Sequence, residues 1–422
     1  MATNETAGTG SSVVVNTCQI CAGEDLESVL FIGYIPPVNQ MRDQGERPME
    51  QPAYPAEMLS CPRCKLVQLG CIVDPQVLFP PDYPYTSGTT GILHRNFEEM
   101  VQDCKQAVLE LGPDDLVVDI GSNDGTLLSK WQAAGHKVHG IEPTDKAQLA
   151  NSNGIPSTQA FFTRDSATAV AAEHGRARIV TATNVFAHIE NIHEIVESIL
   201  CLLADDGVFV SESHYLPSLV ETCQYDTIYH EHLRYYSLHS LQYLFDGHEL
   251  EIIHAKKIPT HGGSIRVYAA RRGRYPVQES VKALMAAERE QGVEGTDWLK
   301  EFAKRVARSK LQLYRLLADI KADGGRVYGI AAPSRASTLI TYTGLDEQTL
   351  DCVLEIKGSH KIGKYMPGTL IPVDEEGRLF ADQPEYALFL AWHIADELIP
   401  KLREKGFKGN FIVPLPEPRI VD

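Results

Sequence analysis

The sequence predicts an α/β protein with two Rossmann-like sheets, preceded by a small cysteine-containing domain. Short apolar runs alternate with helical stretches through most of the chain, which is typical of parallel sheets covered by helices. One of these runs ends in a glycine-rich turn at Gly121–Gly125, and two C-x-x-C pairs lie before it. These three observations predict a ligand-binding α/β core behind a cysteine-containing segment.

The composition is that of a globular protein of two or three domains. The chain has 422 residues, 43% of them hydrophobic and 23% charged, and its formal net charge is −17. That charge argues against general nucleic-acid binding, which needs a basic face. No apolar run is long enough to span a bilayer, and residues 1–16 lack the features of a secretory signal. We therefore expect a cytoplasmic protein without nucleic-acid or membrane partners, whose residues 1–16 form a disordered tail.

Four cysteines near the N-terminus have the spacing of a structural zinc site. Cys18 and Cys21 form one C-x-x-C knuckle, and Cys61 and Cys64 form a second after 39 intervening residues. Four thiolates close a tetrahedral Zn²⁺ site with no open position, which indicates a structural role. The alternative is a set of free thiols. A zinc-binding domain is expected over residues 17–85.

The segment from Phe79 to Gly91 is rich in proline, tyrosine and glycine, and its prolines and glycines forbid a long helix there. Its tyrosines and small hydroxyls either close over a ligand or belong to a plain linker. From Ile92 to Leu111 the pattern is helical and leads into the glycine-rich turn.

The turn after the apolar run Leu116–Val118 predicts a strand, a tight loop and a helix that together hold a nucleoside cofactor. A second run ends in Glu142, which lies 17 residues past Gly125 and is placed to hold ribose hydroxyls. The spacing lacks the third glycine of the dinucleotide fingerprint. It is closer to the D-x-G-x-x-x-G turn of S-adenosylmethionine (SAM) dependent methyltransferases; another nucleotide or a purely structural turn is the alternative. The expected cofactor contacts are Gly121, Ser122, Asn123, Asp124, Gly125 and Glu142.

Further α/β units extend this sheet to seven strands, ending near residue 273. The fourth strand is expected at 177–182 and the fifth at 207–212, with two more at 250–254 and 264–268. Because ligands bind at the carboxyl ends of the strands in such sheets, Asn184 and His188 are expected to face the cofactor, with Asn184 in contact with it.

A dense polar cluster lies between the fifth and sixth strands and contains Tyr229, His230, Glu231 and His232. Histidine, tyrosine and glutamate close together provide acid–base chemistry near neutral pH. Zinc binding by His230 and His232 is one alternative, although an i, i+2 pair does not share a helical face. A purely structural polar network is another.

The last third of the chain predicts helices followed by a second, smaller α/β sheet. Residues 277–323 are charged and helical with an interruption at 292–296, and strands are expected at 326–333, 351–355, 386–392 and 410–414. A helix is expected at 334–342. This unit has no G-x-G-x-x-G turn, so no dinucleotide is assigned to it.

Taken together, the motifs resemble one family. The C-x-x-C pairs, the Tyr-x-Tyr-Thr-Ser-Gly segment, the Gly-Ser-Asn-Asp-Gly turn and Asn-Val-Phe-Ala-His-Ile occur in one order. They are followed by Tyr-His-Glu-His-Leu-x-Tyr-Tyr-Ser, Thr-His-Gly-Gly-Ser-Ile-Arg and Tyr-Gly-Ile-Ala-Ala-Pro-Ser. In this order the chain resembles the nucleotide-sugar C-methyltransferases that build branched deoxysugars, such as the tetronitrose C-3 methyltransferase, over nearly its whole length after residue 16.

The resemblance implies a fold in three parts: a small N-terminal zinc-binding domain, a central Rossmann-like class I SAM methyltransferase domain at 86–273 and a C-terminal helical plus Rossmann-like domain at 274–422. It implies SAM and structural Zn²⁺ as cofactors and a nucleotide-linked 4-keto-6-deoxyhexose as substrate, acted on by a monomer or weak homodimer. Alternatives are methylation of another carbon acid or an amine, or a zinc-stabilised binding protein with an inactive core.

Roles carried over by motif imply one reaction. His232 would remove the C-3 hydrogen beside the C-4 ketone, Tyr229 would relay or stabilise charge and Glu231 would orient a neighbour, while His188 would donate to the enolate oxygen. Relatives usually carry Gly-Ala-Pro-Ala-Lys-Gly where this chain has Ala-Ala-Pro-Ser-Arg-Ala, so Arg335 keeps a positive charge. Tyr85 and Ser87 are added to the expected cofactor contacts, and the expected substrate contacts are Tyr83, His261, Arg266 and Arg335.

Overall fold

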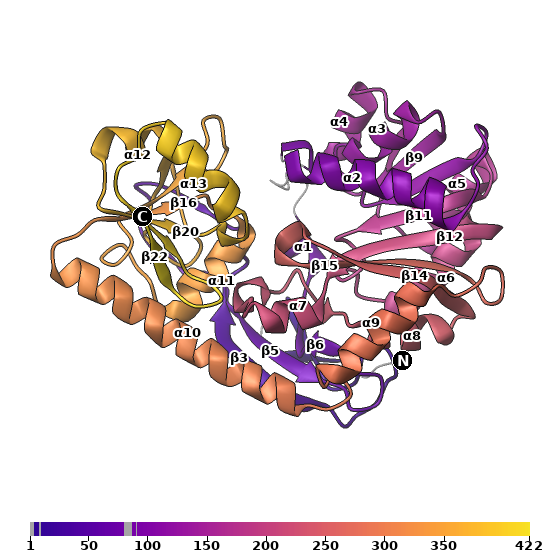
Figure 1. Cartoon of the computed structure of the whole chain (residues 1–422), viewed down its shortest axis with the longest axis horizontal. Helices are drawn as coiled ribbons and strands as arrows, with labels where there is room; N and C mark the ends of the chain where they lie inside the picture. The colour runs from indigo at the N-terminus through magenta and orange to yellow at the C-terminus, as the bar shows by residue number, and fades with distance from the viewer. Residues whose placement is uncertain (1–3, 8–9, 80–86, 90) are drawn as a thin grey trace.

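The computed structural model describes residues 4–7, 10–79, 87–89 and 91–422 and has two lobes joined at their base (Figure 1). The central sheet forms one lobe and the C-terminal sheet forms the other. Strands of the N-terminal segment lie between them at the base, and helix α10 (Asp297–Ala322) runs along the underside. In the described part of the chain no helix is both long and apolar enough to cross a bilayer.

The central lobe is a seven-stranded sheet in the order β10-β9-β8-β11-β12-β15-β14, which confirms the predicted strand number. The first five strands of that order are parallel, whereas β15 runs antiparallel to both β12 and β14. Strand β8 is buried along its whole length, as expected of a central parallel strand covered on both faces. The strands are β8 (Leu116–Ile120), β9 (Lys137–Glu142), β10 (Ser157–Gln159), β11 (Ala177–Thr183), β12 (Leu203–His214), β14 (Leu250–Ile258) and β15 (Ser264–Arg271).

Helices cover both faces of this sheet (Figure 1). Helix α6 is the most apolar of them, with buried residues that include Ile192, Ile195, Val196 and Ile199, so that one face packs on the sheet core. The helices are α2 (Gly91–Asp103), α3 (Thr126–Ala133), α4 (Lys146–Ser152), α5 (Arg164–His174), α6 (Ile192–Leu202), α7 (Leu216–Glu221) and α8 (Leu238–Asp246).

The N-terminal segment contributes strands to three small antiparallel sheets. Two have the orders β1-β2-β7 and β13-β6-β5-β3, in which β13 comes from the central part of the chain. The third pairs β4 (Arg42–Asp43) with β18 (Lys364–Tyr365) of the C-terminal lobe. Burial alternates along β5, so one of its faces packs on the core. The strands are β1 (Asn4–Ala7), β2 (Ser12–Val15), β3 (Glu27–Ile35), β5 (Tyr54–Ser60), β6 (Val67–Leu69), β7 (Cys71–Val73) and β13 (Arg234–Tyr235).

The prediction of a disordered tail is corrected for the described residues of that stretch. Strand β2 pairs with β7, with Val13 opposite Ile72 and Val14 opposite Cys71. Val15 is buried against Ile72 and Leu233. The valines that follow the polar N-terminal residues are a β-rich apolar run, and this pairing buries part of it.

The C-terminal lobe follows helix α9 (Glu279–Glu290) and helix α10, whose break lies where the sequence predicts it. Its sheet has the order β19-β17-β16-β20-β21-β22 and is parallel except for β22. Buried residues recur on α10 at helical spacing, and one core joins that face to β3 and to this sheet. The elements are β16 (Val327–Ile330), α11 (Ser334–Thr343), β17 (Cys352–Glu355), β19 (Val373–Glu375), α12 (Gly377–Asp382), β20 (Tyr386–Phe389), α13 (Ala395–Glu404), β21 (Asn410–Val413) and β22 (Arg419–Val421).

Candidate active site

The glycine-rich turn after β8 has the backbone that a cofactor cradle needs. Gly121, Asn123 and Gly125 all have positive φ. A Cβ at Gly121 would lie 2.4 Å from Val185 Cγ2, and one at Gly125 would lie 2.9 Å from Ile155 Cγ2. The turn is therefore restricted to glycine at both ends by packing as well as by conformation.

Two polar groups beside the turn fit a bound nucleoside. Glu142, at the end of β9, accepts hydrogen bonds from the amides of Asn123 (3.0 Å) and Thr144 (2.9 Å), which fix its carboxylate beside the turn. Asn184 follows β11 with a φ of 55° and donates its amide to the Glu212 carbonyl. Its side-chain Oδ1 is buried and has no hydrogen-bond partner among the described residues. A buried acceptor of this kind is consistent with a site that binds a ligand or water.

Ser87, a predicted cofactor contact, lies next to this turn. Its amide donates to Asn123 Oδ1 at 2.8 Å, and the Gly88 amide donates to Asp124 Oδ2 at 3.0 Å. Two of the predicted site residues, Tyr83 and Tyr85, lie outside the described residues.

The predicted acid–base residues meet around His232, which is only 4% exposed. Its Nδ1 is 2.7 Å from the carbonyl oxygen of Thr227. Because a carbonyl only accepts, Nδ1 carries the proton and Nε2 of the neutral ring keeps its lone pair. This tautomer is suited to a general base.

Four aromatic rings surround that of His232. The ring centroids of Tyr229, His214 and His188 lie 4.2, 4.7 and 5.1 Å from it. The His214 ring is in turn 5.6 Å from the ring of His261, and the Tyr235 ring is 6.4 Å from that of His232. The structure thus brings together residues from four separate stretches of sequence.

Burial keeps the histidines of this cluster neutral. It lowers the pKa of His188 and of His261 to about 4, with the Arg335 charge adding to the effect at His261. Burial and the neighbouring His188 hold the pKa of His232 well below its usual range. Burial also raises the pKa of Tyr229 well above its usual range, so its phenol stays protonated. The cluster therefore combines neutral imidazoles, which can accept a proton, with a protonated phenol, which can donate a hydrogen bond.

Glu231 points toward the N-terminal segment. It accepts a hydrogen bond from Asn39 Nδ2 at 2.7 Å, and Asn39 Oδ1 accepts one from Ser334 Oγ at 3.0 Å. Asn39 therefore joins the acid–base segment to the start of α11 in the C-terminal lobe. No feature of the local sequence around Asn39 indicates this contact.

Arg335 is predicted to contact the substrate, but in the structure its guanidinium is bound to other residues of the protein. Its guanidinium donates to both carboxylate oxygens of Asp226 (2.7 and 3.0 Å) and to Gln224 Oε1 (3.0 Å). It also donates to the His261 carbonyl (3.3 Å) and to Nδ1 of His393 (3.1 Å). These contacts occupy all five N–H donors of an arginine, so the prediction is corrected: Arg335 fastens the C-terminal lobe to the acid–base segment.

The prediction for Arg266 is corrected in the same way. Its side chain is fully buried, and Nε donates to Glu212 Oε1 at 2.6 Å. Its other nitrogens donate to Asp103 and to both the carbonyl and the side chain of Asn96. Arg266 is the centre of a buried ion-pair network that holds α2 against β12 and β15.

The four predicted zinc ligands converge. Their sulfur atoms all lie within 4.8 Å of one another, with Cys18 to Cys64 at 3.3 Å and Cys21 to Cys61 at 3.4 Å. Sulfurs around a tetrahedral Zn²⁺ with bonds of about 2.3 Å are about 3.8 Å apart, so the donor set fits the ion. Zinc bound by four thiolates supplies a structural cross-link.

The alternative of zinc at His230 and His232 has no support in the geometry. Nε2 of His230 is 3.1 Å from the carbonyl oxygen of Pro55, and its ring packs on Tyr54. Within the described ranges, the four cysteines are the one group of His, Cys, Asp and Glu with metal-ligand geometry.

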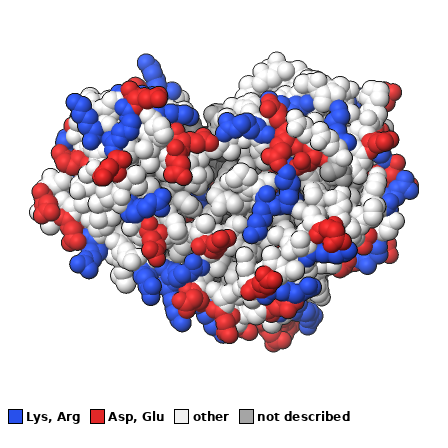
Figure 2. Space-filling view, viewed as in Figure 1, with Lys and Arg blue, Asp and Glu red and all other residues white. Residues whose placement is uncertain are grey.

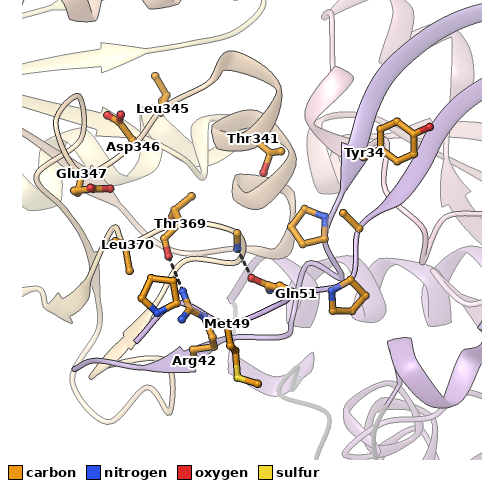
Figure 3. Close-up of a pocket in the computed structure, with 15 residues that line it drawn as sticks. Tyr34, Arg42, Met49, Gln51, Thr341, Leu345, Asp346, Glu347, Thr369 and Leu370 are labelled. Carbon is orange, nitrogen blue, oxygen red and sulfur yellow. Dashed lines mark hydrogen bonds between the residues drawn. The ribbon is translucent and has the colours of Figure 1, made fainter. Parts of the chain in front are cut away.

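A cavity of about 500 Å³ lies between the N-terminal and C-terminal segments (Figure 3). Arg42 donates to the Thr369 carbonyl across it, and the Gly368 amide donates to Gln51 Oε1. Its lining, all of it described, contains no predicted site residue. The cavity therefore belongs to the packing between these two segments.

Two histidines of the site were not singled out in the sequence. His214 is the last residue of β12, which extends two residues past the predicted strand end at residue 212. Ligands bind at the carboxyl ends of parallel strands, so the correct strand end would have indicated His214 as a site residue. His393 follows β20 and contacts Arg335, but no local pattern marks it.

Comparison with known proteins agrees with this architecture. A C-methyltransferase C-terminal domain model matches residues 259–416, a methyltransferase domain model matches 92–255 and a zinc-binding domain model matches 18–79. C-methyltransferase NovU of Streptomyces niveus is 35% identical over 412 residues, which are 96% of this chain and 97% of that protein.

Two solved structures match part of the chain. A SAM-dependent methyltransferase from Anabaena variabilis is 17% identical, with 42% of this chain and 84% of that chain covered and a TM-score of 0.33. Magnesium protoporphyrin IX methyltransferase from Synechocystis, solved with bound SAM, is 15% identical, with coverage of 42% and 79% and a TM-score of 0.32. From the identity with NovU and the three domain models, the chain belongs to the family of SAM-dependent C-methyltransferases with an N-terminal zinc-binding domain.

Proposed function

We propose that this C-methyltransferase methylates C-3 of a nucleotide-linked 4-keto-6-deoxyhexose, in the biosynthesis of branched deoxysugars. The proposal rests on the family resemblance of the motifs and on the chemistry of the histidine cluster. A hydrogen beside a ketone is acidic because the resulting anion is an enolate. A neutral imidazole held among proton donors is suited to removing it.

The observation that carries the proposal is the tautomer of His232. Its Nδ1–H is bound to the Thr227 carbonyl at 2.7 Å, which leaves Nε2 as the basic atom. We assign to this atom the removal of the C-3 hydrogen, so that the C–H electron pair enters the enolate.

Neutral donors are assigned to the enolate oxygen. Burial holds His188 neutral with a pKa of about 4, and a neutral imidazole still has one N–H to donate. The protonated phenol of Tyr229 is a second donor beside the His232 ring. Donors aimed at developing charge lower the barrier to enolate formation.

SAM supplies the methyl group, and the residues that fit it are those of the β8 turn with Glu142, Asn184 and Ser87. The remaining contacts assigned to substrate are Tyr83 and His261. We expect the enzyme to act in the cytoplasm as a monomer or weak homodimer, which size-exclusion chromatography with light scattering checks.

Mass spectrometry in deuterated water tests the reaction. The purified protein is incubated with SAM and a panel of nucleotide-linked 4-keto-6-deoxyhexoses. We expect one added methyl on a sugar, and deuterium at the same carbon when SAM is left out. No methylation of any keto sugar, despite SAM binding, would remove the sugar from the proposal and leave another carbon acid or an amine as substrate.

The base is tested by His232→Ala. Loss of a general base lowers turnover by about 100-fold to 10,000-fold, and SAM affinity should stay unchanged because His232 is not among the residues of the cofactor turn. The matched control is His174→Ala on α5, outside the cluster. Turnover of the His232 variant equal to that of the control would assign the base elsewhere.

A further inference from the structure

The ring of His188 depends for its position on the segment that carries it. In the described part of the chain no hydrogen bond fixes either ring nitrogen, and its ring contacts are with Phe79 and His232. The ring is therefore free to bind a substrate. A donor lowers a barrier only when it is aimed at the developing charge, so the placement of the His188 backbone matters for the proposed reaction.

Arg234 holds the backbone that follows His188. Its Nη1 donates to the Ile189 carbonyl at 2.6 Å, and its Nη2 donates to the Glu190 carbonyl. A planar guanidinium presents N–H groups in a fixed fork that matches two successive carbonyls, whereas a lysine ammonium is a point donor. The contact therefore depends on the shape of the arginine as well as on its charge.

A backbone hydrogen bond holds the residue before His188. The Leu233 amide donates to the Ala187 carbonyl at 3.1 Å. The segment that begins one residue after His232 is thus bonded to the chain on both sides of His188. The ring centroids of the two histidines lie 5.1 Å apart. These contacts fix the separation between the proposed base and the proposed donor to the enolate oxygen.

The burial of Arg234 is unusual for an arginine. The residue is 1% exposed, and its guanidinium is bonded to carbonyls and paired with no carboxylate in the described ranges. A buried charge is costly unless its N–H groups are hydrogen-bonded. The family pattern Leu-x-Tyr-Tyr leaves this position open, so the resemblance assigns Arg234 no role. Its contacts indicate what that role is.

We propose that Arg234 is a positioning residue, which holds His188 at the separation from His232 that proton removal and enolate stabilisation require. It acts through the carbonyls of Ile189 and Glu190 and takes no part in the chemistry itself. The inference rests on the proposed enolate reaction, and its tests separate the two.

Arg234→Lys keeps the charge but loses the planar pair of donors. We expect kcat for methylation of the keto sugar to fall by about 10-fold to 100-fold, because a displacement of about 1 Å at a catalytic group can cost this much in rate. The Kd for SAM should stay unchanged, and the zinc content checks that the variant is folded. If Arg234→Lys does not fold, Arg234→Gln takes its place, since its neutral amide still reaches one carbonyl. An unchanged kcat in the folded variant would overturn the proposal.

Two comparisons separate positioning from general stability. Arg305 also donates to two successive carbonyls, those of Val220 and Glu221, but outside the histidine cluster, so kcat of Arg305→Lys should stay close to that of wild type. In a His188→Ala background, Arg234→Lys should lower kcat by less than about twofold, because the residue through which it acts is gone. An equal fall in the two lysine variants, or additive losses in the double variant, would contradict the positioning role.

Nitrogen-15 NMR of the histidine rings gives a readout without substrate. Burial lowers the pKa of His188 to about 4, so its ring is neutral at about pH 6 in the wild type. Loss of the Arg234 contact should expose the segment to solvent and raise the pKa of His188, so that its ring is partly protonated at about pH 6. His261, whose pKa burial also lowers to about 4, is the internal control and should stay neutral.

The two hypotheses fail separately. An unchanged titration of His188 in the variant would refute the positioning role of Arg234, whatever the substrate proves to be. A wild-type enzyme that methylates no keto sugar would refute the proposed function and leave the NMR result standing.

Discussion

In both Rossmann-like sheets of this enzyme, one central strand is followed by the same kind of backbone turn, but the surroundings of the turn differ between the two sheets. Gly121 follows β8 with φ 66° and donates its amide to the Ile141 carbonyl, while Ala331 follows β16 with φ 65° and donates to the Leu354 carbonyl. An acidic residue ends the neighbouring strand in both sheets and accepts from the turn: Glu142 from the Asn123 amide and Glu355 from the Ala332 amide.

The difference lies in what occupies the space beyond the turn. In the central sheet, the groups beyond the turn include Asn184, whose buried Oδ1 has no hydrogen-bond partner among the described residues. In the C-terminal sheet, Lys361 donates to the Ala332 carbonyl and Arg335 reaches across to Asp226. We propose that the first turn holds the cofactor, whereas the second fastens one lobe to the other. A shared backbone therefore does not imply a shared ligand.

Among the substitutions that test the difference between the two sheets, Arg335→Gln is expected to have the largest effect, a loss of stability. It leaves the Asp226 carboxylate fully buried without its bidentate partner, and breaking such a pair costs about 3–5 kcal/mol. We expect a marked fall in the urea midpoint. The double variant with Asp226→Asn should recover part of the loss, since the uncompensated charge is then gone. Additive losses in the double variant would show that the pair is not coupled.

The cofactor turn is tested by Gly121→Ala. The new Cβ would lie 2.4 Å from Val185 Cγ2, next to Asn184. Overpacking of this kind costs about 1–3 kcal/mol, which corresponds to roughly a tenfold to hundredfold rise in the Kd for SAM if the turn is deformed. Isothermal titration calorimetry measures it. An unchanged Kd would mean that the turn does not hold the cofactor.

The smallest effect is expected from the matching change in the other sheet, Ala331→Gly. A non-glycine residue at positive φ carries about 1–2 kcal/mol of strain, partly offset by the greater freedom of glycine in the unfolded chain. We expect a small rise in the thermal midpoint and no change in the Kd for SAM. A weakened affinity for SAM would contradict the division of roles between the sheets.

Much of this architecture could be predicted from local pattern. The apolar runs located six of the seven strands of the central sheet; the seventh, β10, is a short polar edge strand without such a run. The break between α9 and α10 follows from a glycine-rich interruption. The roles of Arg266 and Arg335 could not be predicted in this way. Each depends on carboxylates far away in sequence, Asp103 and Glu212 for one and Asp226 for the other. The spacing of residues within a motif does not indicate contacts with residues so far away in the sequence.

The strand β13 shows how closely the segments depend on one another. It belongs to the Tyr-His-Glu-His segment, yet it pairs with β6 of the zinc-binding domain, with Arg234 opposite Gln68 and Tyr235 opposite Val67. The Leu69 amide donates to the Leu233 carbonyl beside it. The zinc-binding domain thus holds the segment that carries His232, the proposed base. We therefore expect that this domain cannot be exchanged between relatives as an independent unit: activity should survive an exchange only where the strand corresponding to β13 is exchanged with it.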